Sequence, residues 1–288
     1  MIDLTNAKEL MPRYTDSEPK RTLLYDGKVY MVKFPEPIRG SKHDLSYIYN
    51  QFSEDMGCKI LQSAGLNVQN TFLATYQEKN GEVKIVVACE DFCPPGVRLT
   101  EFKKLMLAVT DREEKRTNSI EMVNEVLEKS NFTGDKTAFK QKFWDMFVGD
   151  ALLGNSDRHL NNFGVIEHNG TISFAPIYDC GSSLSPLLSD EEMERLLSKD
   201  GELSNKEYNT PSFFSYQGRR IFYHEIFKNP PPELAAAIRR VVPHIDMGKT
   251  EQVIQATSGI SAIRKHYLSR SIALRYDKIL LTAWKKLA

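Results

Sequence analysis

The sequence predicts an α+β protein of two lobes, in which an N-terminal antiparallel sheet lobe with one helix precedes a larger, mainly helical C-terminal lobe. Three observations lead to this prediction. Strand-like runs joined by turn dipeptides fill the first 90 residues, a proline-rich stretch follows them, and helical periodicity dominates the remainder. The length of 288 residues, roughly twice that of a common single domain, leaves room for both lobes. We place them at 1–93 and 94–288.

Four strands are expected in the N-terminal lobe, paired as two hairpins: 21–25 with 28–34, and 68–76 with 83–90. The turn dipeptides are Asp26-Gly27 and Asn80-Gly81. Such pairs are typical of type I′ turns, because both central residues of that turn need a positive φ. Pro35 and Pro37 follow the second strand and end it, since proline cannot donate to a strand ladder.

One helix is predicted between the two hairpins, over 44–64. Phe52, Met56 and Ile60 recur at every fourth residue there and predict an apolar face. Asp44 is a suitable N-cap, and Gly65 stands where a left-handed residue commonly ends a helix. The N-terminal lobe is therefore expected to run strand, strand, helix, strand, strand.

The stretch Cys93-Pro94-Pro95-Gly96 interrupts the strand pattern, because its prolines cannot donate to a ladder and bias the preceding residue away from a helix. We place the lobe boundary there. Four helices are expected beyond it: 119–129, 136–153, 232–242 and 260–287. The second carries Phe143, Phe147 and Ala151 as a stripe at helical spacing, which predicts burial.

Composition and charge narrow the function classes. Lys plus Arg and Asp plus Glu both number 38, so no chain-wide field favours nucleic acid, and no direct nucleic-acid binding is expected. No signal-peptide pattern and no apolar run of spanning length stand in the sequence, so we expect a cytoplasmic protein without membrane insertion. The four cysteines form no C-x-x-C pair and are expected to be buried thiols.

A polar segment, 155–162, separates the buried helix that ends at Gly154 from a predicted hairpin, 163–166 with 171–174. Asp157 and Asn162 stand five positions apart in this segment, the D-x-x-x-x-N spacing of kinase catalytic loops. In such loops the aspartate accepts the proton of the acceptor hydroxyl and the asparagine oxygen binds Mg²⁺. Asp179 follows the hairpin, where a second metal-binding carboxylate is expected. These residues predict phosphoryl transfer from ATP.

Lys33 lies among hydrophobic residues near the end of the second predicted strand. In a kinase, a lysine in that position contacts the α- and β-phosphates of ATP and is held by a glutamate from the next helix. Glu54 is our first candidate for this glutamate, and Asp55 is the second.

Taken in chain order, these motifs resemble those of the HipA-like serine/threonine kinases. The similarity extends from about residue 14 through the helical lobe, and the matching stretches are 32–35, the helix with Glu54, 64–68, 155–163 and 175–179. The resemblance implies a two-lobed protein-kinase-like fold with ATP and Mg²⁺ as cofactors. It assigns Lys33 to the ATP phosphates, Asp157 to the catalytic base, and Asn162 and Asp179 to magnesium.

The resemblance also implies an adenine site at an inter-lobe hinge, where main-chain groups of Glu90 and Phe92 hold the base. The segment 13–20 occupies the place of the phosphate-covering loop. Because it contains no glycine, its phosphate contacts are expected to depend on Lys20. Ser17 is a candidate for autophosphorylation.

The partners implied are a protein substrate with an acceptor Ser or Thr and an antitoxin-like regulator. The N-terminal part is shorter than that of the toxin that names the family, so we do not expect a DNA-bound antitoxin complex.

Two other functions and several structural roles stay open at this level. A phosphoinositide-type lipid kinase also uses an Asp-Arg-His-x-x-Asn loop, although no basic amphipathic helix suited to a membrane surface is present. A nucleotide-binding pseudokinase that serves as an interaction module is the other alternative. Asp157 and Asn162 are also common loop-capping residues. Arg158 and His159 are interpreted as supports of the loop.

Overall fold

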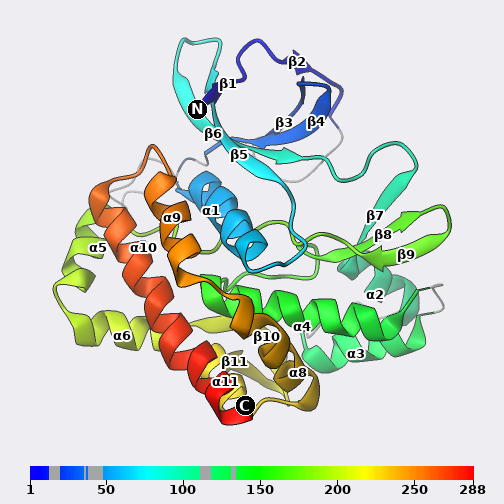
Figure 1. The fold of residues 1–288 in the computed structure, drawn as a ribbon. Helices are drawn as coiled ribbons and strands as arrows, with labels where there is room; N and C mark the ends of the chain where they lie inside the picture. Colours follow the sequence, from blue (N-terminus) through cyan, green and yellow to red (C-terminus); the bar gives the residue numbers. More distant parts are fainter. Residues whose placement is uncertain (13–19, 36, 38–47, 111–117, 131–133) are drawn as a thin grey trace.

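The computed structural model describes residues 1–12, 20–35, 37, 48–110, 118–130 and 134–288. Figure 1 shows a six-stranded sheet at one end of the molecule, a mainly helical part at the other, and helix α1 between them. The α+β architecture predicted from the sequence is thus confirmed. Within the described part of the chain, no helix is both long and apolar enough to cross a bilayer.

The large sheet has the strand order β1-β5-β6-β4-β3-β2. Its strands are β1 (Ile2–Asp3), β2 (Lys8–Glu9), β3 (Lys20–Tyr25), β4 (Lys28–Lys33), β5 (Thr71–Gln77) and β6 (Val83–Glu90). The four longer strands are those predicted, and their pairing is antiparallel. The two-residue strands β1 and β2 were not predicted, and β1 pairs in parallel with β5. Lys33 is the last residue of β4 and stands opposite Val87 in the β4–β6 register.

The two N-terminal hairpin turns differ. Asp26 and Gly27 both have a positive φ, 47° and 74°, as a type I′ turn requires. At the second turn only Gly81 lies in the left-handed region, with a φ of 87°, and the amide of Glu78 donates to the carbonyl of Glu82 at 2.8 Å. The expectation of the same turn type at Asn80-Gly81 is therefore wrong, because a wider loop closes that hairpin.

Helix α1 spans Asn50–Ser63 and begins later than the predicted 44–64. Its N-cap is Tyr49, and the predicted cap, Asp44, lies outside the described residues. Gly65 ends the helix with a φ of 78°, as expected. Ten of the helix residues, Gln51 to Cys58 together with Ile60 and Leu61, are buried, because α1 packs against β5 and β6 on one side and against α9 on another.

A second, three-stranded sheet lies beside the helical part (Figure 1). It contains β7 (Val97–Glu101), β8 (Gly164–His168) and β9 (Thr171–Phe174). The β8–β9 hairpin was predicted, and its turn residues Asn169 and Gly170 both have a positive φ. Strand β7 was not predicted, nor was helix α2 (Phe102–Thr110) that follows it. A Cβ at Gly164 would lie 2.3 Å from the carbonyl oxygen of Thr100, so the β7–β8 pairing requires a glycine there.

The helical part is built around α4 (Lys136–Leu153), whose bounds agree with the prediction. The other elements are α3 (Ile120–Lys129), α5 (Asp190–Leu197), α6 (Asp200–Tyr208), β10 (Pro211–Tyr216), β11 (Arg219–Phe222), α7 (Tyr223–Lys228), α8 (Pro232–Val241), η1 (Val242–His244), α9 (Met247–Ala256), α10 (Ala262–Arg275), η2 (Tyr276–Leu281) and α11 (Thr282–Leu287). The helix predicted over 260–287 is continuous from Ala262, with one π-helical stretch, η2, in it.

Two hydrophobic cores hold these layers. A small core around Leu23, Val32 and Val86 lies within the large sheet. A much larger core surrounds α4, whose Phe143 and Phe147 are 2% and 0% exposed, and it includes the apolar residues of α1. Because α1 shares this core with helices that follow it, the boundary proposed at residues 93 and 94 stays a prediction.

Candidate active site

The segment that follows α4 is shaped by its own side chains. Gly154 ends the helix with a φ of 69°, and Asn155 then turns back to it. The side-chain nitrogen of Asn155 donates to Asp150 Oδ1 at 3.0 Å, and its side-chain oxygen accepts from the amide of Asp157 at 3.1 Å. These bonds place Asp157 at the entrance of the loop without any contribution from its own carboxylate.

Arg158 connects this loop to the strand end that carries Asp179. Its guanidinium is fully buried and pairs with Asp150, with Nη2 at 2.8 Å from Oδ1 and Nε at 2.9 Å from Oδ2. Nη1 donates to the main-chain carbonyls of Asn162 at 2.9 Å, of Asp179 at 3.3 Å, and of Tyr178. Burial alone would lower the pKa of Arg158, but Asp150 and Cys180 together outweigh burial and raise it. Arg158 is thus a charged support of the loop, as the sequence indicated.

Lys33 brings the sheet and the helical part together. Its Nζ lies 2.8 Å from Asp179 Oδ1 and 3.3 Å from Glu54 Oε2, and both Lys33 and Glu54 are buried. The second candidate, Asp55, faces elsewhere, because its carboxylate pairs with Lys59 at 2.7 Å and accepts from Thr71 at 3.0 Å. Glu54 is therefore the α1 carboxylate that forms an ion pair with Lys33.

Asp179 has a φ of 59°, a left-handed conformation that non-glycine residues adopt at a cost. The bonds from Arg158 to the carbonyls of Tyr178 and Asp179 hold this conformation in place. Burial would raise the pKa of Asp179, but Lys33 outweighs it, with smaller contributions from Arg158 and His159, and the pKa is lowered. The carboxylate is therefore ionised at neutral pH.

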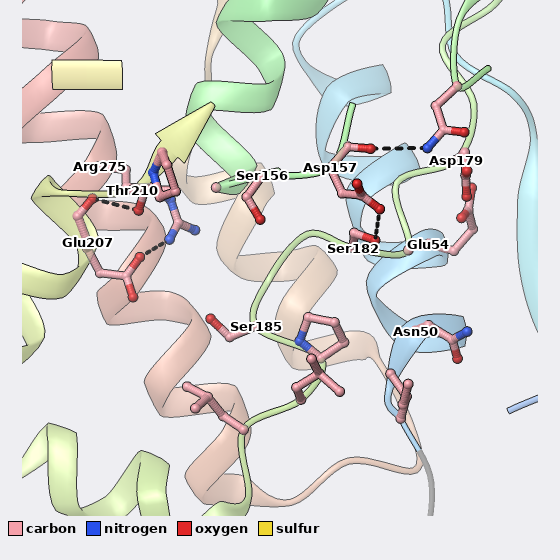
Figure 2. Close-up of a pocket in the computed structure, with 18 of the residues that line it drawn as sticks. Asn50, Glu54, Ser156, Asp157, Asp179, Ser182, Ser185, Glu207, Thr210 and Arg275 are labelled. Carbon is pink, nitrogen blue, oxygen red and sulfur yellow. Dashed lines mark hydrogen bonds and ion pairs between the residues drawn. The ribbon is translucent and has the colours of Figure 1, made fainter. Parts of the chain in front are cut away.

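One cavity of about 770 Å³ contains these groups. Lys33, Glu54, Asp157, Asn162 and Asp179 all line it, and Figure 2 shows Asp157, Asp179 and Glu54 on the same side. Asn162 Nδ2 donates to the carbonyl of Asp157 at 3.2 Å, which leaves the amide oxygen for a cation. Asp157 Oδ2 accepts a long hydrogen bond from Ser182 Oγ at 3.4 Å, which shows that a hydroxyl group can approach this carboxylate oxygen.

The donor set at this site fits a hard metal ion. Nowhere in the described ranges do three or more His, Cys, Asp or Glu side chains gather as a metal-binding group. Asn162 and Asp179 instead offer an amide oxygen and a carboxylate. That is the sparse oxygen set with which proteins hold Mg²⁺ when phosphate oxygens and water complete its coordination.

The remaining predicted site residues lie outside the described lining of this cavity. Lys20 opens β3 and stands opposite Lys33 in the β3–β4 register. The carboxylate of Glu90 pairs with Lys28 at 3.0 Å, and its carbonyl accepts from Gln69 Nε2 at 2.9 Å. Phe92 packs its ring 5.7 Å from that of Tyr178. The structure therefore groups the phosphate, metal and base candidates, but not the adenine and loop candidates.

Four further charged residues at the site were not singled out from the sequence. Asp150 pairs with Arg158, and a carboxylate within the otherwise apolar last turns of α4, 146–153, was the available signal. Lys206, Glu207 and Arg275 line the same cavity from helices far along the chain. No local pattern marks them.

Comparison with known proteins places the chain in a family. The model of the HipA-like C-terminal domain matches residues 17–247. The chain belongs to the HipA-like family. This HipA-like protein is 36% identical, over 271 residues, to the serine/threonine-protein kinase CtkA of Helicobacter pylori strain J99, an alignment that covers 91% of the chain and 80% of the relative.

Solved structures agree with this assignment. The crystal structure of a Helicobacter pylori proinflammatory kinase CtkA matches this HipA-like chain with a TM-score of 0.91 and 33% identity, over 99% of the chain and 97% of CtkA. HipA of Shewanella oneidensis MR-1, solved with HipB and operator DNA, matches with a TM-score of 0.56 and 13% identity, over 96% and 67% of the two chains. The second likeness concerns the fold alone.

These relationships confirm the predicted family, the two-part kinase-like fold and the enzyme class, a serine/threonine kinase. They do not favour the lipid-kinase and pseudokinase alternatives. The roles of individual site residues stay predictions.

Proposed function

We propose that this HipA-like kinase transfers the γ-phosphoryl group of Mg²⁺-ATP to a serine or threonine hydroxyl of a protein. The observation that carries the proposal is the position of Lys33 Nζ, which contacts both Glu54 and Asp179 in the cavity that Asp157 and Asn162 also line. A strand lysine, a helix glutamate and two oxygen ligands around one space are what phosphoryl transfer needs for positioning and charge neutralisation.

In this proposal each side chain has one task. Lys33 binds the α- and β-phosphates, and Glu54 holds the ammonium group in place. Asn162 and Asp179 would hold Mg²⁺, which supplies charge neutralisation to the phosphates when it is bound. Asp157 orients the acceptor hydroxyl and accepts its proton through Oδ2, the oxygen that Ser182 reaches at 3.4 Å.

The adenine and loop assignments rest on the family resemblance. We propose that main-chain groups of Glu90 and Phe92, at the end of β6, hold the adenine. The Glu90 carbonyl already accepts one bond from Gln69 and has a second lone pair to offer. Lys20 is proposed to approach the phosphates from the start of β3. Ser17, the autophosphorylation candidate, lies outside the described residues.

The setting of the reaction is also a proposal. Cys58, Cys89, Cys93 and Cys180 are all free thiols, which suits a reducing compartment that supplies ATP, and we place the enzyme in the cytoplasm. The Shewanella HipA was solved with HipB and operator DNA, which motivates an antitoxin-like regulator as a partner here. No direct contact of this chain with nucleic acid is proposed, because its net charge is zero.

A labelling assay tests the function. Pure protein is incubated with γ-labelled ATP and Mg²⁺ together with a cell extract, and in parallel with lipid vesicles, for the wild type, Asp157→Asn and Asp179→Asn. Asp277→Asn, an exposed carboxylate on η2, is the matched control. We expect label in protein with the wild type and the control and none with the two site variants. Label in lipid, or protein label that survives both substitutions, contradicts the proposal.

A further inference from the structure

The cavity that contains Asp157 extends to a second group of charges. Lys206 and Glu207 lie in the last turn of α6, and Arg275 is the final residue of α10. Figure 2 shows Arg275, Glu207 and Thr210 on one side of the cavity, with Asp157, Asp179 and Glu54 on the other. We call Lys206, Glu207 and Arg275 the distal cluster.

The distal cluster is closely bonded. Glu207 Oε1 accepts from Lys206 Nζ at 2.9 Å and from the hydroxyl of Tyr267 at 3.0 Å, and Oε2 pairs with Arg275 Nη1. Lys206 also donates to the Tyr267 hydroxyl at 2.8 Å and to Ser185 Oγ at 3.2 Å. One carboxylate thus neutralises two cations.

The surplus charge of this cluster is positive and mostly buried. Burial disfavours the charged forms of Glu207 and Lys206. Arg275 and Lys206 nevertheless lower the pKa of Glu207, and Glu207 and Tyr267 raise the pKa of Lys206, so Glu207 and Lys206 are both ionised at neutral pH. Arg275 is 2% exposed, and its Nη2 has no hydrogen-bond partner among the residues that the structure describes. Buried donors are nearly always paired, so a donor and a positive charge without a partner indicate an anion that is still to bind.

The distal cluster is joined directly to the catalytic loop. Arg275 Nε donates to the carbonyl of Leu152, in the last turn of α4, at 2.8 Å. A Cβ at Gly154 would lie 2.9 Å from Arg275 Nη1, so the guanidinium packs against the residue at which the loop begins. An anion bound here would therefore sit at a fixed place relative to Asp157.

The walls between the distal cluster and Asp157 suit a polypeptide. Figure 2 shows the hydroxyl side chains of Ser156, Ser182, Ser185 and Thr210 in this region, and Asn209 also lines the cavity. Leu187 lies at the same cavity with 52% of its surface exposed, where it can contact an apolar residue of a bound chain. The phosphates of ATP are assigned to Lys33 on the opposite side of the cavity. The distal cluster is therefore available to bind the polypeptide that carries the acceptor hydroxyl.

We propose that the distal cluster is an acceptor-side subsite that binds an anionic side chain of the substrate polypeptide, a carboxylate or a phosphate, near the acceptor serine or threonine. This inference rests on the proposed function and adds a substrate class to it. Lys206, which is partly exposed, makes the first contact, and Arg275 supplies the charge behind it. The acidic residue orients the acceptor hydroxyl toward Asp157.

A peptide array on the wild-type protein tests this subsite. Peptides with one central serine carry a single Asp, Glu or phosphoserine at each flanking position, and matched peptides carry Asn, Gln or Ser instead. At one position we expect the acidic residue to raise kcat/KM roughly tenfold over its neutral isostere, the size of one charge-assisted contact. Comparison of the Asp and Glu peptides with the phosphoserine peptides shows whether the subsite prefers a carboxylate or a phosphate. A flat profile across all positions overturns the inference.

Three lysine variants connect the preference to the cluster. Lys206→Met keeps the aliphatic stem and should reduce the acidic-to-neutral ratio to about twofold or less, whereas Lys206→Arg should keep most of it. Lys199→Met, a lysine before α6 that pairs with Glu202 outside the cavity, should leave the ratio unchanged. An acidic preference that survives in Lys206→Met overturns the assignment. If Lys206→Met does not fold, the peptide array is compared between the wild type and Lys206→Arg, and loss of the acidic preference from both proteins overturns the inference. Absence of transfer to any polypeptide defeats the proposed function instead.

Discussion

Two charged clusters line one cavity, and they differ in the sign of the charge that is left over. On one side Lys33 pairs with the carboxylates of Glu54 and Asp179, and the Asp157 carboxylate lines the same cavity. On the other side Lys206 and Arg275 share the single carboxylate of Glu207. The first side lacks positive charge and suits a metal ion, and the second lacks negative charge and suits an anion. A balanced net charge for the whole chain conceals this separation.

The clusters also differ in how they are held. Lys33 comes from a strand whose Val32 belongs to the small core of the sheet, whereas Glu54 comes from α1, which belongs to the large core. The distal cluster joins α6, α10 and the end of α4, and these helices all contribute to the large core. The first cluster therefore depends on the fit between two cores, and the second depends on one.

The largest expected effect is on the first cluster. Asp157→Asn should lower kcat for protein phosphorylation by about 10²- to 10⁴-fold, because the acceptor proton loses its base. Thermal stability should change little, since the loop is held by Asn155 and Arg158 and not by the Asp157 carboxylate. Steady-state kinetics with a thermal melt checks both. A variant that is inactive only because it is unfolded would contradict this separation of roles.

The next effect is on stability, at the distal cluster. Glu207→Gln should cost roughly 3 kcal/mol in the free energy of unfolding, because the buried Arg275 and the partly exposed Lys206 lose their carboxylate. The folded-state pKa of Glu207 is lowered from 4.5, so its contribution is complete above that pH and is lost as pH falls through the lower folded value. Denaturant unfolding between pH 7 and pH 3 should thus show a weaker acid dependence in the variant. Equal acid dependence in both proteins would contradict the charge assignment.

A smaller effect distinguishes the neighbouring carboxylates of α1. Glu54→Gln should raise the KM for ATP by about tenfold, since Lys33 loses its ion pair with Glu54 and about 1.5 kcal/mol with it. Asp55→Asn is the matched control, because Asp55 pairs with Lys59 and Thr71 instead. Its KM for ATP should remain within about twofold of the wild type. An equal rise in KM for both substitutions would contradict the assignment of Glu54, and not Asp55, as the partner of Lys33.

The smallest effect concerns Ser182. Its hydroxyl lies 3.4 Å from Asp157 Oδ2, a long contact, so Ser182→Ala should change kcat by no more than about threefold. A loss comparable to that of Asp157→Asn would mean that Ser182 positions the base. The first cluster would then depend on the segment after Asp179 as well as on the loop.

Several elements could be predicted because their signals are local. Asp26-Gly27 and Asn169-Gly170 form the turns predicted from their tolerance of a positive φ, whereas Asn80-Gly81 does not. The apolar stripe of α4 predicted the helix, and the glycine after it predicted its C-terminal end. The short strands β1 and β2 and the β7–α2 connection were missed, because they are specified by their pairing partners and not by their own residues.

The order of motifs along the chain was enough to predict that Lys33, Glu54, Asp157, Asn162 and Asp179 gather around one site, and the structure places all of them at one cavity. It also determined the family. The roles of these residues remain to be tested by the variants above. Asp55 could not be separated from Glu54 by sequence, because one residue of helical rotation decides which carboxylate faces the sheet.

The distal cluster was decided by tertiary structure alone. Glu207 and Arg275 are 68 positions apart, and each looks like an ordinary surface charge on its own helix. Only the packing of α6, α10 and the end of α4 around the large core buries them together and leaves Arg275 Nη2 unpaired among the described residues. Local sequence patterns predict turns, caps and helices, because these depend on the backbone of the segment itself. The burial of a charged side chain depends on every element that packs over it, so it is decided by the tertiary structure.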